Sequence, residues 1–304
     1  MNHQKKETEF ENSFQNFLLT CKACLFSRLA EPLGYTLFAV SGILITWGAG
    51  NVSLSGILSR SARLFPAWFF VVASVYVFND IFDMELDREN NLSRPLAEGN
   101  ANSRHAIYLF ILLFTSGLVL SLTISFTMAI VSLTFIGLGI MYSLPSIRIK
   151  KVFLGKSLTL STGFSLSVLA GGVASRHITH ELIFVTSCIF AFIFFTSPLA
   201  DLKDIDGDKK ENIKTFPNII GQKNTLLIGI LSYLMLPFLS LVGNIFLDFN
   251  YLYTLFLSLI SAVNIKKIFP LWKNGASQGA YKKLRNFQIL TVILVALIFF
   301  LETI

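Results

Sequence analysis

Long apolar segments follow one another along almost the whole chain, and this pattern restricts the possible folds more than any other feature. A helix needs about 20 apolar residues to cross the hydrocarbon core of a bilayer. Nine segments come close to that length, at residues 30–49, 62–82, 105–123, 126–144, 157–174, 182–200, 225–243, 246–264 and 286–303. Only 14% of the 304 residues are charged, whereas a soluble domain carries about 25%. The sequence therefore predicts an all-α integral membrane protein with nine transmembrane helices.

The distribution of basic residues predicts how these helices are oriented. With nine spans, 22 of the 25 Lys and Arg residues fall on the side of the N-terminus, and the other side carries only Arg60, Arg63 and Arg176. Because loops rich in Lys and Arg stay in the cytoplasm, we expect a cytoplasmic N-terminus and an outer C-terminus, with the plasma membrane as the default location. The net charge of +7 then reflects topology, and nucleic acid is not an expected partner.

The first 28 residues form a polar segment ahead of the membrane domain expected at 29–304. Within it, Phe10, Phe14, Phe17 and Leu18 recur at helical spacing. This pattern is typical of an amphipathic helix lying on a membrane surface, so residues 1–28 are predicted to be cytosolic or interfacial.

One acidic pattern occurs twice, each time directly after an apolar segment. The spacing D-x-x-D-x-x-x-D is shared by two sets of aspartates, namely Asp80, Asp83 and Asp87, and Asp201, Asp204 and Asp208. On a helix, steps of three and four keep the carboxylates of each set within an arc of roughly 60°. We expect two carboxylate stripes at the cytoplasmic mouths of membrane helices.

Two interpretations of these acidic loops compete: solvated helix ends, or a functional site. Eleven of the 18 acidic residues lie in the two loops. Acidic side chains at membrane depth are functional candidates, and anionic groups are disfavoured at a helix C-terminus.

Close carboxylates repel one another unless a cation separates them, and Mg²⁺ prefers oxygen ligands, often shared with a substrate phosphate. With Arg88, Arg94 and Lys203 nearby to bind phosphate oxygens, the pattern favours a magnesium-diphosphate site.

A third element, residues 142–151, follows the fourth predicted span. Pro145 ends the helix there and turns Tyr142, Arg148 and Lys150 toward the cytoplasmic mouth. The alternative is structural, because Tyr is common in membrane-interface belts and long basic side chains snorkel from helix ends. Composition does not decide between the two.

These three elements resemble the motifs of the UbiA-type intramembrane prenyltransferases. The family motif N-D-x-x-D-x-x-x-D matches residues 79–87, and the R-P-L that follows it matches residues 94–96. The second motif, D-x-x-D-x-x-G-D, matches residues 201–208, and the third, Y-S-x-P-x-x-R-x-K, matches residues 142–150. A K-T-L-P and a Gly follow the second motif in the family, and residues 214–221 carry the corresponding K-T-F-P and Gly. The resemblance covers nearly the whole chain.

Two positions depart from the family pattern. Asn212 stands where a Gly is common, and Phe216 where a Leu is common. Neither is a proposed metal ligand, so these departures concern the subfamily rather than the chemistry.

The resemblance implies a fold and a mechanism. The fold is a nine-helix bundle around a central apolar cavity capped on the cytoplasmic side. An isoprenyl diphosphate would bind through Mg²⁺, with two ions expected, and an acceptor would attack the allylic cation after pyrophosphate leaves. The implied metal ligands are Asn79, Asp80, Asp83, Asp87, Asp201, Asp204 and Asp208. The implied catalytic residues are Asp83, Asp87, Asp204, Asp208 and Tyr142. The implied diphosphate-binding residues are Arg88, Arg94, Arg148, Lys150 and Lys203.

The acceptor and two alternative functions stay open at this point. The form D-x-K-D-x-x-G-D looks more like members that prenylate glyceryl phosphate ethers, homogentisate or chlorophyllide than like the 4-hydroxybenzoate enzymes. An aromatic quinone precursor is the first expectation and an archaeal-type lipid the next. One alternative is a terpene cyclase of the same family. The other is a cation transporter, although transport sites usually lie near the bilayer midplane and these motifs lie at helix ends.

Overall fold

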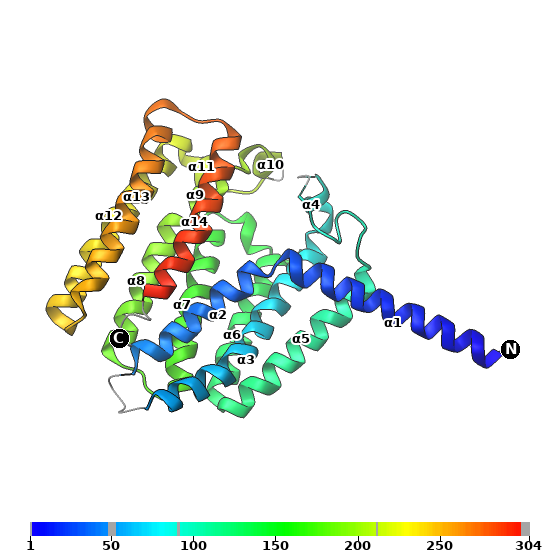
Figure 1. Cartoon of the computed structure of the whole chain (residues 1–304). Coiled ribbons are helices and arrows are strands. Elements are labelled where there is room, and N and C mark those ends of the chain that lie inside the picture. The colour runs from blue at the N-terminus through cyan, green and yellow to red at the C-terminus, as the bar shows by residue number, and fades with distance from the viewer. Residues whose placement is uncertain (1, 48–52, 90–91, 211, 299–304) are drawn as a thin grey trace.

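The computed structural model describes residues 2–47, 53–89, 92–210 and 212–298, with side chains from residue 13 onward. Within these ranges the secondary structure is helical throughout (Figure 1). The long helices are α1 (Asn2–Ser27), α2 (Ala30–Ile45), α3 (Leu54–Phe82), α5 (Ser103–Ile124), α6 (Phe126–Ser143), α7 (Gly155–Ser175), α8 (His180–Thr196), α12 (Gln222–Leu247), α13 (Tyr251–Asn274) and α14 (Gln278–Ile298). The short helices are α4 (Met84–Glu89), η1 (Ile149–Lys151), α9 (Pro198–Asp201), α10 (Ile205–Lys210) and α11 (Phe216–Ile220).

Seven stretches of helix within the described ranges are long and apolar enough to cross a membrane, namely α3, α5, α6, α7, α8 with α9, α12 and α13. An eighth span results if Ser13–Ser27 and Ala30–Ile45, which meet at 62°, count as one bent unit. The chain is thus an all-helical, multi-pass membrane protein. Helices α2 and α14 overlap the remaining predicted segments, but parts of those segments lie outside the described residues, so nine spans stay a prediction.

The tight joins at Ser121–Ser125 and Gly243–Asp248 in the sequence predict two helical hairpins, and the structure contains both, as α5–α6 and α12–α13. Ser125 alone separates α5 from α6, and its side chain accepts a hydrogen bond of 3.0 Å from the Met128 backbone nitrogen. Asn250 caps α13 in the same way, accepting from the Leu252 backbone nitrogen at 3.0 Å. Such caps satisfy backbone donors that the first turn of a helix leaves free. The last two helices are longer than predicted, because α13 continues to Asn274 and α14 begins at Gln278.

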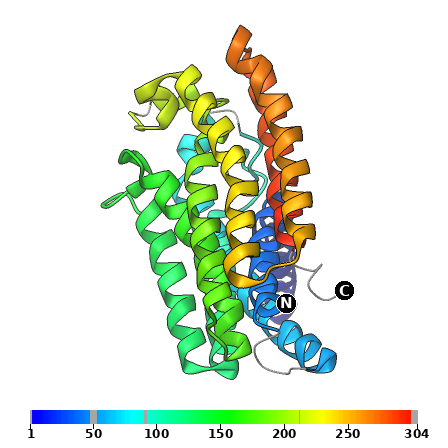
Figure 2. The ribbon, with the colours of Figure 1, turned by 90° about the vertical axis from the view of Figure 1, so that its left-hand side faces the viewer.

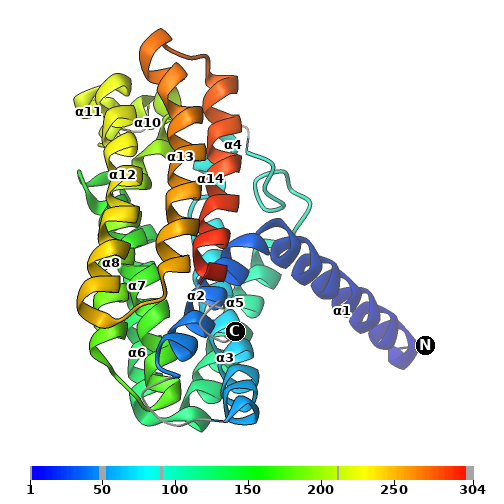
Figure 3. The ribbon, with the colours of Figure 1, turned by 60° about the vertical axis from the view of Figure 1, so that its left-hand side comes forward.

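The long helices pack as a closed ring. Contacts run from α2 to α3, then through α6, α7, α8, α12, α13 and α14 back to α2, with α5 packed outside α3. Figures 2 and 3 show the helices roughly parallel, and in Figure 1 α1 extends well away from the bundle. Only 22% of the most apolar window of α5 and of α13 is buried. These two helices therefore present most of their apolar surface outward, as lipid-facing helices do.

The pair α2–α7 lies at the centre of the core. Both helices contribute to two separate clusters of buried apolar side chains, one shared with α8, α12 and α14 and the other with α3 and α6. The two backbones approach closely at Gly42 and Gly171. A Cβ atom built on Gly171 would lie 2.1 Å from the Ala39 carbonyl oxygen, and one built on Gly42 would lie 2.1 Å from the Val168 carbonyl oxygen. Small residues allow membrane helices this approach.

Gly171→Ala is therefore expected to destabilise the fold by about 2 kcal/mol, because the added methyl group forces α2 and α7 apart. The free energy of unfolding in a mixed-micelle denaturation series measures the effect. Gly137→Ala in α6 is the matched control, since a Cβ there meets nothing within 4 Å. A Gly171→Ala protein as stable as the Gly137→Ala protein would contradict the close approach.

Both acidic motifs lie at one end of the bundle, called the motif end from here on. In Figure 1 this is the upper end, where the short helices α4, α9, α10 and α11 lie near the turn between α13 and α14. Helix α1 meets the bundle near this end, where Phe17, Cys21, Cys24 and Leu25 pack against α3 and α5. The surface location proposed for α1 stays a prediction, and the side chain of Phe10 lies outside the described residues.

Candidate active site

The first motif begins in the last turn of α3 and continues into α4. Asn79 and Asp80 belong to α3, and Asp83 ends that helix, its backbone nitrogen donating to the Asn79 carbonyl oxygen at 2.9 Å. Asp87 follows in α4, where its backbone nitrogen donates to the Asp83 carbonyl oxygen at 2.7 Å. Asp80, Asp83 and Asp87 are each no more than 6% exposed as whole residues.

The second motif repeats this geometry. Asp201 ends α9, the Asp204 backbone nitrogen donates to the Asp201 carbonyl oxygen at 3.0 Å, and Asp208 lies in α10. The prediction of a single helix under each stripe was wrong in detail, because both helices break within the motif, at Asp83 and at residues 202–204. Negative charges are unfavourable near a helix C-terminus. At each break the backbone leaves the helix and turns across the motif end of the bundle.

Four of the motif carboxylates pair with cations, three of them from outside the acidic motifs and one, Lys203, from within the second motif. Arg28, between α1 and α2, donates from Nε to Asp80 Oδ1 at 2.9 Å and to Oδ2 at 3.1 Å. The other three ion pairs are Lys150 with Asp83, Lys156 with Asp201, and Lys203 with Asp204. Each pair offsets part of the cost of burying a carboxylate, so the two motifs are fixed to the surrounding helices.

The third aspartate of each motif is different. Asp87 and Asp208 are 6% and 7% exposed, and the Oδ2 atom of each has no hydrogen-bond partner in the described part of the chain. Burial raises the pKa of both carboxyls to about 6. A buried acceptor left without a partner is costly, and a bound cation would remove that cost.

The third element supplies a further cation to the first motif. Arg148 adopts a left-handed backbone at φ 45° ahead of η1, and Lys150 in η1 is 5% exposed. Arg148 Nη2 lies 3.9 Å from Asp83 Oδ1. In the last turns of α6, Ser143 Oγ accepts a hydrogen bond from Asn79 Nδ2 at 2.8 Å, while the same amide group donates to Asp83 Oδ2 at 2.7 Å. The element thus contacts the first motif directly.

A cavity of about 320 Å³, the first lobe, opens between the two motifs. It brings together Asn79 and Arg94 from the first acidic loop, Tyr142, and Lys203 and Asp204 from the second. Charged residues absent from the predicted set also line it, namely Arg28, Glu31, Lys156 and Arg285. Apolar side chains such as Val75, Phe135 and Leu138 line its remaining wall. The first lobe is therefore a charged head region with an apolar extension.

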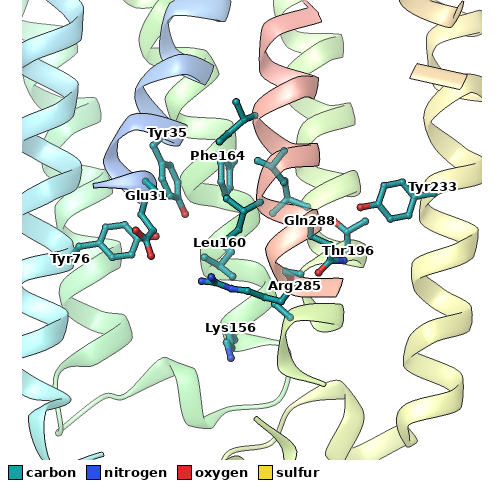
Figure 4. A pocket seen from close by; sticks show the side chains of 18 residues that line it. Glu31, Tyr35, Tyr76, Lys156, Leu160, Phe164, Thr196, Tyr233, Arg285 and Gln288 are labelled. Carbon is teal, nitrogen blue, oxygen red and sulfur yellow. The ribbon is translucent and has the colours of Figure 1, made fainter. Parts of the chain in front are cut away.

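A second lobe of about 210 Å³ lies beside the first, between α2, α7, α8, α12 and α14 (Figure 4). The two lobes share seven lining residues, namely Glu31, Tyr35, Tyr76, Lys156, Leu160, Ala200 and Arg285. In Figure 4, Lys156 and Arg285 lie at one end, with Glu31, Tyr35 and Tyr76 on one side and Tyr233, Gln288 and Thr196 on the other. The shared walls make the two lobes adjacent parts of one site.

Several predicted site residues are not among those lining either lobe, namely Asp80, Asp83, Asp87, Asp201, Asp208, Arg88, Arg148 and Lys150. Arg88 Nε donates to the Ala97 carbonyl oxygen at 3.1 Å and so braces the first acidic loop. Arg94 lines the first lobe and also donates from Nη1 to the Ser27 carbonyl oxygen at 3.1 Å.

Across the described residues, no three His, Cys, Asp or Glu side chains cluster closely enough to hold a metal ion. Four of the six motif aspartates pair with a cation instead.

Sequence reasoning missed Arg28, Lys156 and Arg285. Each is a basic residue within a few positions of an apolar segment, on the side that carries both acidic motifs. That position was a usable signal, but the same position also fits an inside-positive anchor. Only the packing of α2, α7 and α14 around the cavity distinguishes the two roles.

The geometry defines a class of protein: a multi-pass membrane protein with a charged head region and an apolar cavity at one end of a helical bundle. Residues 31–300 match the UbiA prenyltransferase family. The chain therefore belongs to the UbiA prenyltransferase family, and it is an enzyme that transfers prenyl groups.

Named relatives extend this comparison. The digeranylgeranylglyceryl phosphate synthase of Saccharolobus solfataricus is 28% identical over 235 residues, 77% of this chain and 80% of that protein. A 2-acylphloroglucinol 4-prenyltransferase of Humulus lupulus is 31% identical over 228 residues, 70% of this chain but only 50% of that protein.

Solved structures show the same fold. One described as a digeranylgeranylglyceryl phosphate synthase has a TM-score of 0.68 at 23% identity, covering 96% of this chain and 98% of that one. A UbiA homologue from Archaeoglobus fulgidus, bound to DMAPP and Mg²⁺, has a TM-score of 0.64 at 18% identity, covering 90% and 99%.

Proposed function

We propose that this enzyme transfers a prenyl group from an isoprenyl diphosphate to a hydroxyl of a glyceryl phosphate-type lipid and releases pyrophosphate. The observation that carries the proposal is the first lobe, where both acidic motifs meet cations at the mouth of an apolar cavity. The synthase relatives support a glyceryl phosphate acceptor over an aromatic one, since the chain covers four fifths of the Saccharolobus protein.

The residues present fit Mg²⁺ as the cofactor, with two ions proposed. The donor set is carboxylate and amide oxygen, which Mg²⁺ prefers, and the unpartnered Oδ2 atoms of Asp87 and Asp208 are free to accept a cation. The ligands would be Asn79, Asp83, Asp204 and Asp208, supported by Asp80, Asp87 and Asp201. Bound there, the metal would neutralise the diphosphate and stabilise the pyrophosphate as it leaves.

The protein's own groups have separate tasks. Arg94 and Lys203 line the first lobe and would bind diphosphate oxygens, where bidentate guanidinium contacts are strong. Tyr142 lines the same lobe and would orient the diphosphate. Phe135 and Leu138 would hold the first part of the prenyl chain and exclude water from the allylic cation.

The proposed reaction balances as a substitution at C1 of the donor. The C1–oxygen bond breaks and its electron pair leaves with pyrophosphate. A new ether bond forms between C1 and the acceptor hydroxyl oxygen, and the hydroxyl proton passes to a pyrophosphate oxygen.

We also propose the arrangement in the membrane that the distribution of Lys and Arg predicts. The motif end would face the cytoplasm, with the N-terminus on that side, the C-terminus outside and nine spans in total. Residues 1–28 would lie along the inner surface ahead of the catalytic domain at 29–304.

The test is pyrophosphate release from geranylgeranyl diphosphate by purified protein, with and without Mg²⁺. The acceptors are geranylgeranylglyceryl phosphate, 4-hydroxybenzoate and none, and mass spectrometry follows the lipid extract. We expect Mg²⁺-dependent release that requires the glyceryl phosphate, together with a product heavier by one prenyl group. Release without acceptor that yields a cyclic hydrocarbon would indicate a cyclase instead, and no release under any condition would contradict prenyl transfer.

A further inference from the structure

Arg285 is a cation in the cavity wall without a protein counter-ion. It lies in α14, is partly buried, and lines both lobes. Arg28, Lys150, Lys156 and Lys203 each pair with a motif aspartate, whereas no described residue forms an ion pair or hydrogen bond with Arg285. Glu31 is the acidic residue that lines the same lobe, and it pairs with Arg28 rather than with Arg285. Its Oε1 lies 3.6 Å from Arg28 Nη1.

The burial of such a group favours an anionic ligand. Removing a charged side chain from water without a partner is costly, and a guanidinium group is suited to bidentate contact with phosphate. Figure 4 shows the Arg285 side chain reaching from α14 into the space above Lys156. A phosphate bound by Arg285 would therefore lie at the entrance to the second lobe.

The face that α14 presents to the second lobe changes from polar to apolar along the helix. Arg285, Gln288, Ile289, Val292 and Ile293 line the lobe, and their spacing of three and four places them on one side of the helix. The polar residues come first and the apolar ones follow. This order fits a ligand with an anionic head and an apolar chain.

A second, independent observation marks the polar end of this lobe. Gln288 is only 8% exposed, and its Nε2 makes no hydrogen bond of normal geometry among the described residues, although its amide interacts with the Tyr233 hydroxyl. Figure 4 places Gln288 beside Thr196, with the Tyr233 hydroxyl pointing toward both. A buried amide donor without a well-formed hydrogen bond is costly, and a ligand oxygen at this position would accept one from Gln288.

We propose that the second lobe binds the acceptor. Arg285 binds the phosphate of the acceptor, Gln288 donates to an acceptor oxygen, and the apolar face of α14 holds the acceptor's existing chain. The inference rests on the proposed function. The donor diphosphate then binds in the first lobe, between the two motifs, and the acceptor headgroup binds in the adjoining second lobe. The seven lining residues that the lobes share bring the two substrates together.

The first experiment measures binding without turnover, so that it does not depend on the reaction. Microscale thermophoresis would compare geranylgeranylglyceryl phosphate with its dephosphorylated form, in the absence of donor. For the unaltered protein we expect tighter binding of the phosphorylated lipid. For Arg285→Gln, we expect the dissociation constant of the phosphorylated lipid to rise by at least about tenfold and the preference over the dephosphorylated lipid to disappear.

The second experiment is steady-state kinetics with both substrates varied. Arg285→Gln should raise KM for the acceptor by more than KM for geranylgeranyl diphosphate, because Arg285 lines both lobes but is proposed to bind the acceptor phosphate. Gln288→Leu should raise the acceptor KM for both the phosphorylated and the dephosphorylated lipid. Lys283→Gln is the matched control, since Lys283 lies on the exposed side of the same helix.

Three results would overturn the assignment. They are equal affinity of Arg285→Gln and unaltered protein for the phosphorylated lipid, an equal loss in the Lys283→Gln control, and a rise in donor KM alone. The third would place Arg285 in the donor site. Failure of the proposed function is a different outcome, because a protein that transfers no prenyl group would still report on this site through the binding experiment.

Discussion

Asp204→Asn is expected to lower kcat/KM for prenyl transfer by about a thousandfold or more. The side chain lines the first lobe, and an amide there removes one of the charges that a metal-bound diphosphate requires. Folding should be unaffected, because the Asp204 side chain is 36% exposed and its partner Lys203 is 21% exposed. Exposed ion pairs contribute little to stability. The rate of pyrophosphate release and the unfolding midpoint together separate the two effects.

Asp206→Asn is the control for this prediction. Asp206 lies two residues away in α10, is exposed, and accepts a hydrogen bond from Gln278 Nε2 at 2.5 Å outside the cavity. We expect it to retain nearly full activity. An Asp204→Asn enzyme that works within about threefold of the unaltered protein would remove the second motif from the site.

Lys156→Gln is expected to reduce both activity and stability. Lys156 lines both lobes and pairs with Asp201, which is 2% exposed. Its loss leaves a buried carboxylate without a partner and removes a cation from the diphosphate region. We expect kcat/KM to fall by about a hundredfold. Since the Lys156 side chain is still 27% exposed, we expect the free energy of unfolding to fall by about 2 kcal/mol, less than for a fully buried pair.

Lys156→Arg distinguishes charge from packing at this position. Because Arg keeps the cation, it should restore most of the stability lost in Lys156→Gln. Denaturation of both variants in the same detergent measures the difference. Gln and Arg variants that are equally unstable would show that shape, rather than the charge on Asp201, controls this position.

Much of the fold follows from the sequence because each span is a local signal. Apolar length predicted the helices, and the short joins at Ser121–Ser125 and Gly243–Asp248 predicted the hairpins. Each acidic motif directly follows an apolar segment, so each was expected at a helix end, and the structure has both there. These features depend on residues close together in the chain.

The rest depends on packing between distant segments. The break of each helix within its motif depends on contacts with other helices, such as the pairing of Lys150 with Asp83 and of Lys156 with Asp201. Arg28 and Arg285 reach the cavity from opposite ends of the chain, so no motif spacing relates them. The second lobe exists because α14 packs against α2 and α9, and periodicity within α14 alone does not reveal its neighbours.

The most direct test of the central claim is the Mg²⁺ dependence of donor binding. The probe is geranylgeranyl thiodiphosphate, a donor analogue whose carbon–sulfur bond resists cleavage, titrated into the unaltered protein, Asn79→Ala and Asp204→Asn. If the diphosphate binds between the two motifs, affinity requires Mg²⁺ in the unaltered protein and is lost in both variants. Tight binding without Mg²⁺, unchanged by either substitution, would contradict a diphosphate site shared by the two motifs.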